Sequence, residues 1–138
     1  EHYYEGVVSG SDVADAMGEN HGKVFKTLVT VGKSGQHFVF MIPVDEELDL
    51  KKAASAAGEK SVAMIKSKEL LPLTGYIHGG CSPIGMKKQF KTFIHQTADS
   101  FDTIYFSGGR VGSQVEMAPS DLKKAVPVLS RDLVKEPQ

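Results

Sequence analysis

Apolar residues dominate two neighbouring stretches, residues 24–31 and 37–44, which the short segment GKSG (residues 32–35) separates. Two short apolar stretches on either side of a glycine-containing turn predict a pair of β-strands joined as a hairpin. The first stretch has apolar side chains on both faces, which is typical of a central, buried strand. Lys26 is the exception, because a buried ammonium group needs a partner or an anionic ligand. The alternative is a lysine that protects an exposed strand edge.

Helical spacing and capping residues predict several helices between further strands. Asp49 is placed to cap a helix over residues 51–57 that ends at Gly58. Its expected apolar stripe consists of Leu50, Ala53, Ala54 and Ala57. Other helical segments are expected at residues 10–17, 68–74 and 97–101 and from residue 118, and other strands at residues 61–65, 91–95, 103–107 and 113–117 and after residue 126. Strands joined by both hairpins and helices predict one α/β (α+β) domain with a mixed sheet.

The segment GGCSPIG, residues 79–85, is the most distinctive loop of the chain. Glycine permits a positive φ and a close approach of other groups, whereas proline stiffens the backbone. A rigid loop with bare N–H groups near its start suits an anion or an oxyanion. A tight turn without a further role is the alternative. Lys87, Lys88 and Lys91 follow the loop, either as a phosphate-binding group or as a solvated face.

Composition limits the functional classes. The chain has 138 residues and is 41% hydrophobic, which suffices for one domain with a core. Its net charge of −1 argues against non-specific nucleic-acid binding, so any RNA contact is expected to be local. The single cysteine, the lack of a signal peptide and the lack of an apolar run of about 18 residues predict a cytoplasmic protein without a membrane span. The chain begins at Glu1, which indicates a natural start further upstream.

The sequence offers little conventional catalytic machinery. The five histidines show no metal-binding spacing, so neither a metal nor a cofactor is expected. Cys81 could act as a nucleophile with His78, but no third residue is evident that would orient the histidine. A small, semi-buried cysteine and a surface histidine are the alternative. A reaction at this site would therefore draw its nucleophile from water or from the substrate.

Seven short motifs occur in a characteristic order over residues 1–125. They are FKTL (25–28), LKKAA (50–54), TGY (74–76), GGCSPIG (79–85), TIY (103–105), SGG (107–109) and VEMAPSDL (115–122). In this order they resemble the YbaK/EbsC family of aminoacyl-tRNA deacylases, which is related to the editing domain of bacterial prolyl-tRNA synthetases. The resemblance implies a single compact domain around a mixed, barrel-like sheet, with a pocket for the aminoacylated 3′ end of tRNA. The helix with which family members usually begin is missing from this chain.

The resemblance also implies roles for individual residues. The family's lysine matches Lys26, and its glycine–proline loop matches residues 79–83, in which the N–H groups of Gly80 and Cys81 would face the ester oxygen. The expected catalytic residues are Lys26, Gly79, Gly80 and Cys81, the last through its backbone, since the family does not require a cysteine there. The expected substrate-binding residues are Tyr4, Thr27, Ser82, Pro83 and Ser107, and the expected tRNA-binding residues are Lys87, Lys88 and Lys91.

The function that the resemblance implies is trans-editing: hydrolysis of mischarged tRNA, above all Cys-tRNA(Pro) and/or Cys-tRNA(Cys), without a protein nucleophile. An Ala-tRNA(Pro) deacylase and a non-catalytic module that binds tRNA or a synthetase are the alternatives. The expected partners are mischarged tRNA and prolyl-tRNA synthetase, which could deliver it to a nearly neutral protein. Either a monomer or a dimer is compatible with the sequence.

Overall fold

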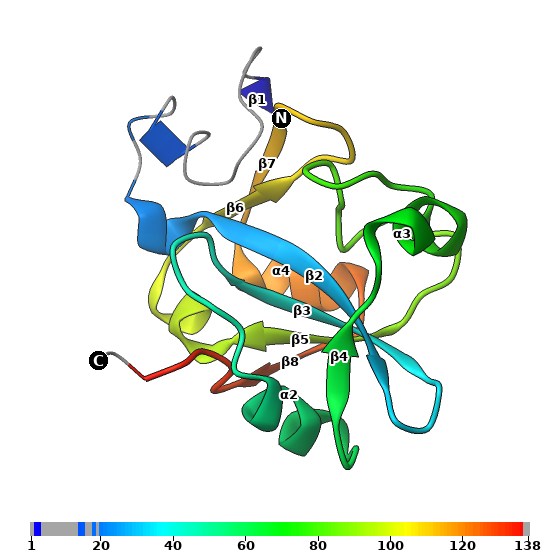
Figure 1. Cartoon of the computed structure of the whole chain (residues 1–138). Helices are drawn as coiled ribbons and strands as arrows, with labels where there is room; N and C mark the ends of the chain where they lie inside the picture. Colours follow the sequence, from blue (N-terminus) through cyan, green and yellow to red (C-terminus); the bar gives the residue numbers. More distant parts are fainter. Residues whose placement is uncertain (1, 4–13, 16–17, 19, 137–138) are drawn as a thin grey trace.

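The computed structural model describes residues 2–3, 14–15, 18 and 20–136 (Figure 1). The expected helix at residues 10–17 lies outside the described residues, apart from Ala14 and Asp15. Tyr4 lies outside them as well.

A five-stranded mixed sheet forms the centre of the molecule, with the strand order β4-β2-β3-β5-β8. The strands are β2 (Phe25–Gly32), β3 (His37–Pro43), β4 (Val62–Met64), β5 (Lys91–His95) and β8 (Val128–Arg131). The pairs β2–β3 and β2–β4 are antiparallel, whereas β5 runs parallel to both β3 and β8. The predicted hairpin is confirmed, and β2 lies inside the sheet.

A smaller antiparallel sheet with the order β1-β7-β6 continues the first one. Its strands are β1 (His2–Tyr3), β6 (Ile104–Ser107) and β7 (Ser113–Met117). A parallel bridge between Val24 and Tyr105 joins the start of β2 to β6. Strand β2 therefore has β6 beside its first residues and β4 beside its last ones, so the two sheets form one curved surface (Figure 1).

In the part of the chain that the structure describes from residue 20 onwards, three α-helices and two short 3-10 helices surround the sheets. They are α2 (Leu50–Ala57), α3 (Ser67–Thr74), α4 (Pro119–Ala125), η1 (His21–Lys23) and η2 (Gln96–Ser100). Asp49 caps α2 by accepting hydrogen bonds from the N–H groups of Lys51 and Lys52, and Gly58 ends it in the left-handed conformation. Pro119 occupies the first turn of α4, where its missing N–H costs nothing.

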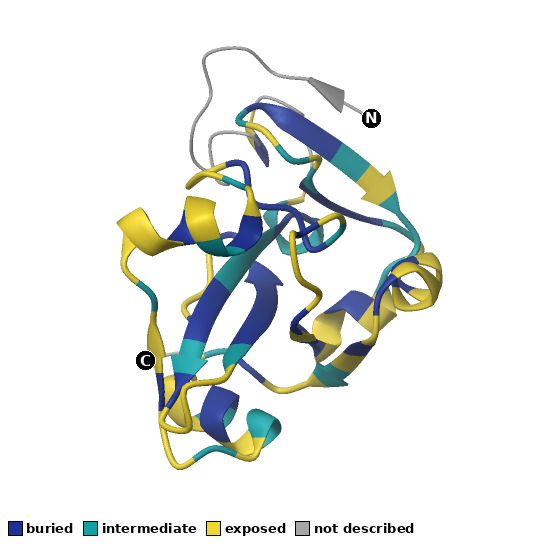
Figure 2. Cartoon of the chain, turned by 90° about the vertical axis from the view of Figure 1, so that its right-hand side faces the viewer, coloured by how far each residue is buried: buried dark blue, intermediate teal, exposed yellow. Residues whose placement is uncertain are grey.

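The two faces of β2 and β3 bury different parts of the core. Phe25 and Met41 pack with Leu122 of α4, whereas Phe40 and Ile42 pack with Ala53 of α2. Since neighbouring residues of a strand point to opposite faces, α4 and α2 cover opposite sides of the sheet. Figure 2 shows these central strands as largely buried and the outer sides of the helices as exposed.

The apolar stripe expected for α2 was wrong in one position. Ala53 and Ala54 are buried, but Leu50 is 42% exposed. Side chains of a helix tilt towards its N-terminus, so the first residue projects beyond the turn that packs on the sheet. No helix within the described ranges is long and apolar enough to cross a membrane.

Candidate active site

Lys26 lies in the first half of β2, with its backbone paired to Ile42 of β3. The residue is only partly exposed, and burial lowers the pKa of its ammonium group, although Glu47, Asp45 and Glu46 oppose this shift. In the part of the chain that the structure describes, the side chain of Lys26 makes no ion pair or hydrogen bond. The side chain is thus a partly desolvated cation without a protein partner, which is the state expected of a group that binds a ligand.

The carboxylates near Lys26 are bound to other groups. Glu47 forms an ion pair with Lys135 at 2.9 Å, and Asp45 contacts Nδ1 of His21. The second ring nitrogen of His21 lies 2.8 Å from Asp15, and these two carboxylates raise the pKa of His21. The acidic segment therefore attracts Lys26 at longer range without neutralising it.

Ser107 lies on the same face of the curved sheet as Lys26. The bridge between Val24 and Tyr105 is parallel, and Lys26 and Ser107 each follow a bridged residue by two positions, so their side chains project from the same face. The hydroxyl oxygen of Ser107 accepts a hydrogen bond of 3.2 Å from the N–H of Gly109, which fixes the turn after β6. Two residues expected at the site from opposite halves of the chain thus share one face of the sheet.

The glycine–proline loop at residues 79–85 packs against the β6–β7 turn (Figure 1). A Cβ atom at Gly80 would lie 2.8 Å from the Cα of Arg110 and 2.9 Å from the backbone nitrogen of Val111. Only glycine permits so close an approach of two backbones. The absence of a side chain at position 80 is therefore explained by contact between two loops, and the loop is connected to the turn that begins at Ser107.

The expectation that the loop starts with bare N–H groups needs a correction at Gly80. Its N–H donates a hydrogen bond of 2.9 Å to the carbonyl of Ile77, so it is already paired and does not face a ligand. Gly79 has a φ of 83°, which favours glycine whatever its surroundings. Of the two N–H groups proposed for the ester oxygen, only that of Cys81 stays a candidate.

Tyr76 connects the two loops through its ring. A Cβ atom at Gly85 would lie 2.8 Å from the Tyr76 hydroxyl oxygen, and one at Gly109 would lie 3.0 Å from its Cε1 atom. Both glycines have positive φ values, 78° and 111°. The ring thus fits between two segments that are 24 residues apart in sequence, and it holds their relative positions.

Cys81 is a buried core residue. Its side chain packs with Val29 and Val39, and burial raises the pKa of the thiol to about 12, although Thr74 opposes this shift by hydrogen bonding. A thiol with this pKa carries almost no thiolate near neutral pH. His78 is exposed. These surroundings favour the interpretation of Cys81 as a small buried residue over that of a Cys–His pair.

The other expected substrate-binding residues differ in their surroundings. Thr27 is the neighbour of Lys26 but points to the opposite face of β2, where its buried Oγ1 atom has no hydrogen-bond partner. Ser82 is buried, and its hydroxyl oxygen accepts a hydrogen bond of 3.2 Å from the N–H of Ile84. Pro83 is also buried. Thr27 therefore has a free polar atom, whereas Ser82 and Pro83 hold the shape of the loop.

The lysines proposed for tRNA are exposed. The N–H of Lys87 donates a hydrogen bond of 3.0 Å to the carbonyl of Thr74 at the end of α3, which fixes the backbone there. The ammonium of Lys91 lies 5.7 Å from the centre of the Phe93 ring. Lys88 is exposed as well. All three are accessible to a phosphate backbone.

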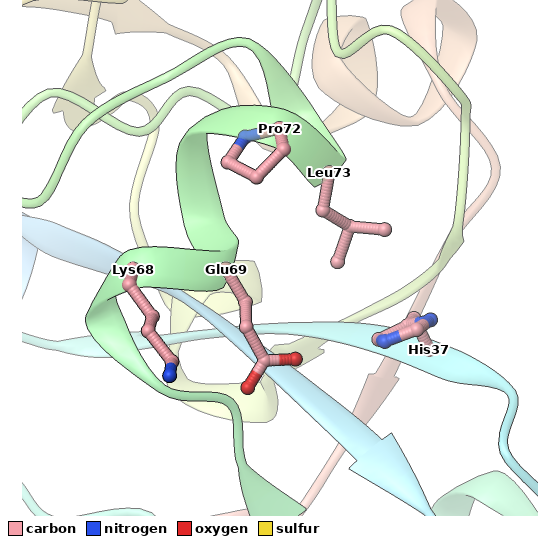
Figure 3. Close-up of a pocket in the computed structure, with 5 residues that line it drawn as sticks. All are labelled: His37, Lys68, Glu69, Pro72 and Leu73. Atoms are coloured by element: carbon pink, nitrogen blue, oxygen red, sulfur yellow. The ribbon is translucent and has the colours of Figure 1, made fainter.

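A hollow lies between α3 and the start of β3 (Figure 3). It is lined by His37, Lys68, Glu69, Pro72 and Leu73. These residues include none of those expected from the sequence. No group of three or more His, Cys, Asp or Glu side chains within the described ranges could hold a metal ion.

Gln114 was missed from the sequence. It pairs directly with Ser107 across β6 and β7, and it is only 6% exposed. In the sequence SQVEM of this strand, Gln114 and Glu116 lie on the same face, and this pattern predicts a solvent-exposed face. The pattern therefore gave no signal that this amide is buried beside a candidate site.

Comparison with known proteins gives a consistent result. The family model described as "Aminoacyl-tRNA editing domain" matches residues 5–125. EbsC of Enterococcus faecalis, provisionally assigned as a Cys-tRNA(Pro)/Cys-tRNA(Cys) deacylase, is 50% identical over 112 residues, which are 81% of this chain and 68% of EbsC. A proline–tRNA ligase of Fervidobacterium nodosum is 32% identical over 85 residues, which are 62% of this chain and 15% of the ligase.

The fold is shared with solved structures. One of them, described provisionally as a trans-editing enzyme for prolyl-tRNA synthetase, superposes with a TM-score of 0.88 over 99% of this chain and 85% of that one. Its sequence is 23% identical, so this likeness concerns the fold. It confirms the expected α+β architecture.

Proposed function

Because the chain belongs to the family of aminoacyl-tRNA editing domains, and is thus a hydrolase that deacylates aminoacyl-tRNA, we propose that it clears Cys-tRNA(Pro) and Cys-tRNA(Cys) in trans. The assignment of the 50% identical relative supports cysteine as the amino acid. Ala-tRNA(Pro) is the alternative substrate. A module that binds tRNA or a synthetase without hydrolysis is the alternative function.

The observation that carries this proposal is the unpaired, partly buried ammonium group of Lys26. Hydrolysis breaks the bond between the aminoacyl carbonyl carbon and the ribose oxygen, and negative charge develops on the carbonyl oxygen. Lys26 binds a polar group of the aminoacylated end, and the N–H of Cys81 faces the ester oxygen. Ser107 shapes the pocket next to Lys26, and Tyr4 is proposed to do the same.

The nucleophile comes from outside the protein in this proposal. The Cys81 thiol, with its pKa of about 12, stays protonated and cannot attack the ester. Water is one source, and the thiol of a cysteinyl substrate is the other. Lys87, Lys88 and Lys91 contact the acceptor stem, and prolyl-tRNA synthetase is the proposed partner that delivers the tRNA.

Hydrolysis of labelled Cys-tRNA(Pro), Cys-tRNA(Cys), Ala-tRNA(Pro) and Pro-tRNA(Pro) tests the proposal. We expect turnover of the two cysteinyl substrates, and we expect Lys26→Ala to lower it by about 10²-fold or more because the cation that holds the aminoacylated end in position is removed. Lys33→Ala is the matched control, since Lys33 is an exposed lysine in the turn that follows β2. This variant should keep the wild-type rate.

Three results would contradict the proposal. A folded Lys26→Ala protein with near-normal turnover would remove Lys26 from the site. Binding of tRNA without hydrolysis of any of the four substrates would favour the non-catalytic module. Faster hydrolysis of Ala-tRNA(Pro) than of the cysteinyl substrates would assign the protein to the alanine-specific activity.

A further inference from the structure

A row of three polar residues crosses three neighbouring strands on one face of the curved sheet. Ser107 of β6 is paired directly with Gln114 of β7 in the antiparallel ladder. Residues paired in this way project from the same face. On the other side of β6, the parallel bridge between Val24 and Tyr105 connects the start of β2, so Lys26, two residues after Val24, projects from the same face as Ser107. The order across the sheet is therefore Lys26, Ser107, Gln114: an ammonium, a hydroxyl and an amide.

The amide of Gln114 is buried and lacks a partner for its oxygen. The residue is 6% exposed, and its Oε1 atom is one of two buried side-chain oxygens without a hydrogen-bond partner in the described part of the chain. The other is Oγ1 of Thr27, on the opposite face of β2. Leaving a buried acceptor unpaired destabilises a fold, so such a group calls for a functional explanation.

We propose that the side-chain oxygen of Gln114 accepts a hydrogen bond from the α-ammonium group of the aminoacyl ester. This assignment rests on the proposed deacylase function. An amide oxygen can only accept, so its ligand must be a donor. The α-ammonium is the charged donor of the substrate, and hydrogen bonds to charged groups are the stronger ones.

The position of Lys26 fixes the direction in which the substrate lies. Strand β6, which carries Ser107, lies between the start of β2 and strand β7, which carries Gln114. The ammonium of Lys26 repels the ammonium of the substrate and attracts its oxygen atoms. The ester and ribose therefore lie towards Lys26, the α-ammonium lies towards Gln114, and Ser107 lies between them.

A pair of substrates and a pair of variants test this assignment. Cysteinyl-tRNA and N-acetyl-cysteinyl-tRNA differ in the α-ammonium, which acetylation converts to a neutral amide. The wild-type protein is expected to hydrolyse the free form with a kcat/KM about tenfold to a hundredfold higher. Gln114→Met, which keeps the length of the side chain and removes the acceptor, should lose most of this preference. Gln114→Glu, which keeps acceptor oxygens, should retain it.

Thermal stability separates binding from a structural role. Gln114→Met removes an unpaired buried amide, so its Tm is expected to equal or exceed that of the wild type while its rate on free cysteinyl-tRNA falls. Gln96→Met, at an exposed position in η2, is the control and should change neither quantity.

Equal losses of Gln114→Met on the free and the acetylated substrate would overturn the assignment, as would a lowered Tm with an unchanged preference for the free amine. Failure of the proposed function would look different, because the wild-type protein would then hydrolyse neither substrate. In that case the assignment of Gln114, which depends on this function, would be withdrawn with it.

Discussion

Burial shifts the pKa values of Lys26 and Cys81 in opposite directions. It lowers the pKa of the Lys26 ammonium and raises that of the Cys81 thiol to about 12, because in both cases the charged form is disfavoured. Lys26 is only partly buried and has acidic residues near it, so it can stay charged for a substrate. Cys81 packs in a cluster of mainly apolar side chains, where the neutral thiol is favoured.

Replacement of Cys81 by serine tests whether the protein supplies the nucleophile. Cys81→Ser should keep kcat/KM within about threefold of the wild type, since the thiol is protonated and only the backbone N–H at position 81 is used. Single-turnover hydrolysis of Cys-tRNA(Pro) measures this. Detection of an aminoacyl adduct on Cys81 by mass spectrometry, together with loss of turnover in the variant, would restore the thiol as nucleophile.

At the scale of single residues, the sequence revealed Lys26 but not Gln114. A charge within an apolar strand violates the pattern around it, and this made Lys26 conspicuous. Gln114 fits an alternating strand with one polar face, so it violates nothing. Its burial arises from the pairing of β7 with both β1 and β6, which a local pattern does not encode.

At the scale of the elements, the loop at residues 79–85 needs glycine for two different reasons, which the sequence alone could not distinguish. Gly80 contacts the backbone of Arg110, and Gly79 has a positive φ. Both reasons are structural, whereas the sequence suggested free N–H groups and passage of the substrate. Hairpins and caps were predictable because they depend on neighbouring residues. Contacts between loops depend on residues about 30 positions away.

Substitutions at Gly79 test whether the substrate also passes close to this loop. Gly79→Ala is expected to lower turnover strongly and to lower the free energy of unfolding by about 1 kcal/mol or somewhat more, because alanine is strained at this φ. Gly79→Asn adds a side chain that tolerates positive φ better, so its Tm should stay closer to the wild type while turnover is still reduced. Melting curves and single-turnover rates on the same samples give both quantities.

Gly35 offers a matched control. Its φ is +90°, and a Cβ atom there would have no neighbour within 4 Å. Gly35→Ala should therefore show the cost of backbone strain with unchanged turnover. If Gly79→Ala behaves in the same way, losing stability but not rate, the loop at residues 79–85 is a structural connection alone.

At the scale of the whole molecule, the C-terminal segment closes the face of the sheet that α2 covers. The ammonium of Lys52 in α2 binds Asp132 at 2.9 Å, the carbonyl of Val134 at 2.8 Å and Glu136 at 2.8 Å. The N–H of Asp49 donates to the carbonyl of Leu133 at 2.8 Å. These contacts join segments about 80 residues apart. The sequence predicted a short final strand but not the contacts of the C-terminal segment with α2, because no local pattern shows which distant residues this segment contacts.

His95 lies beneath this closure and is 6% exposed. Its Nδ1 atom accepts a hydrogen bond of 3.1 Å from the N–H of Leu133, which requires that this nitrogen carry no proton. Burial lowers the pKa of His95 below 6.5, although Asp132 opposes the shift from 3.9 Å. We consider the lowering to prevail because Lys52 already binds Asp132.

Proton binding to His95 makes the folding stability depend on pH. The unfolded chain takes up a proton at this histidine before the folded one does, so its contribution to stability is complete above pH 6.5 and is lost as the pH falls towards the folded pKa. Four carboxylates have lowered pKa values: Asp99, Asp132, Glu47 and Glu59. Their contributions to folding stability are lost in a more acidic range, below pH 3.8 for the aspartates and below pH 4.5 for the glutamates. His21 has a raised pKa, so its small surface contribution is lost as the pH rises above 6.5.

We therefore expect wild-type stability to decline as the pH falls below 6.5, and this decline to be much smaller in His95→Gln, which accepts a hydrogen bond but does not titrate. Urea denaturation midpoints at half-unit pH intervals measure the difference between the two proteins. His21→Gln is the control, and it should decline with acidification as the wild type does. Parallel curves for wild type and His95→Gln would mean that His95 has the same pKa in the folded and the unfolded chain. The hydrogen bond from Leu133 would then not hold the histidine neutral.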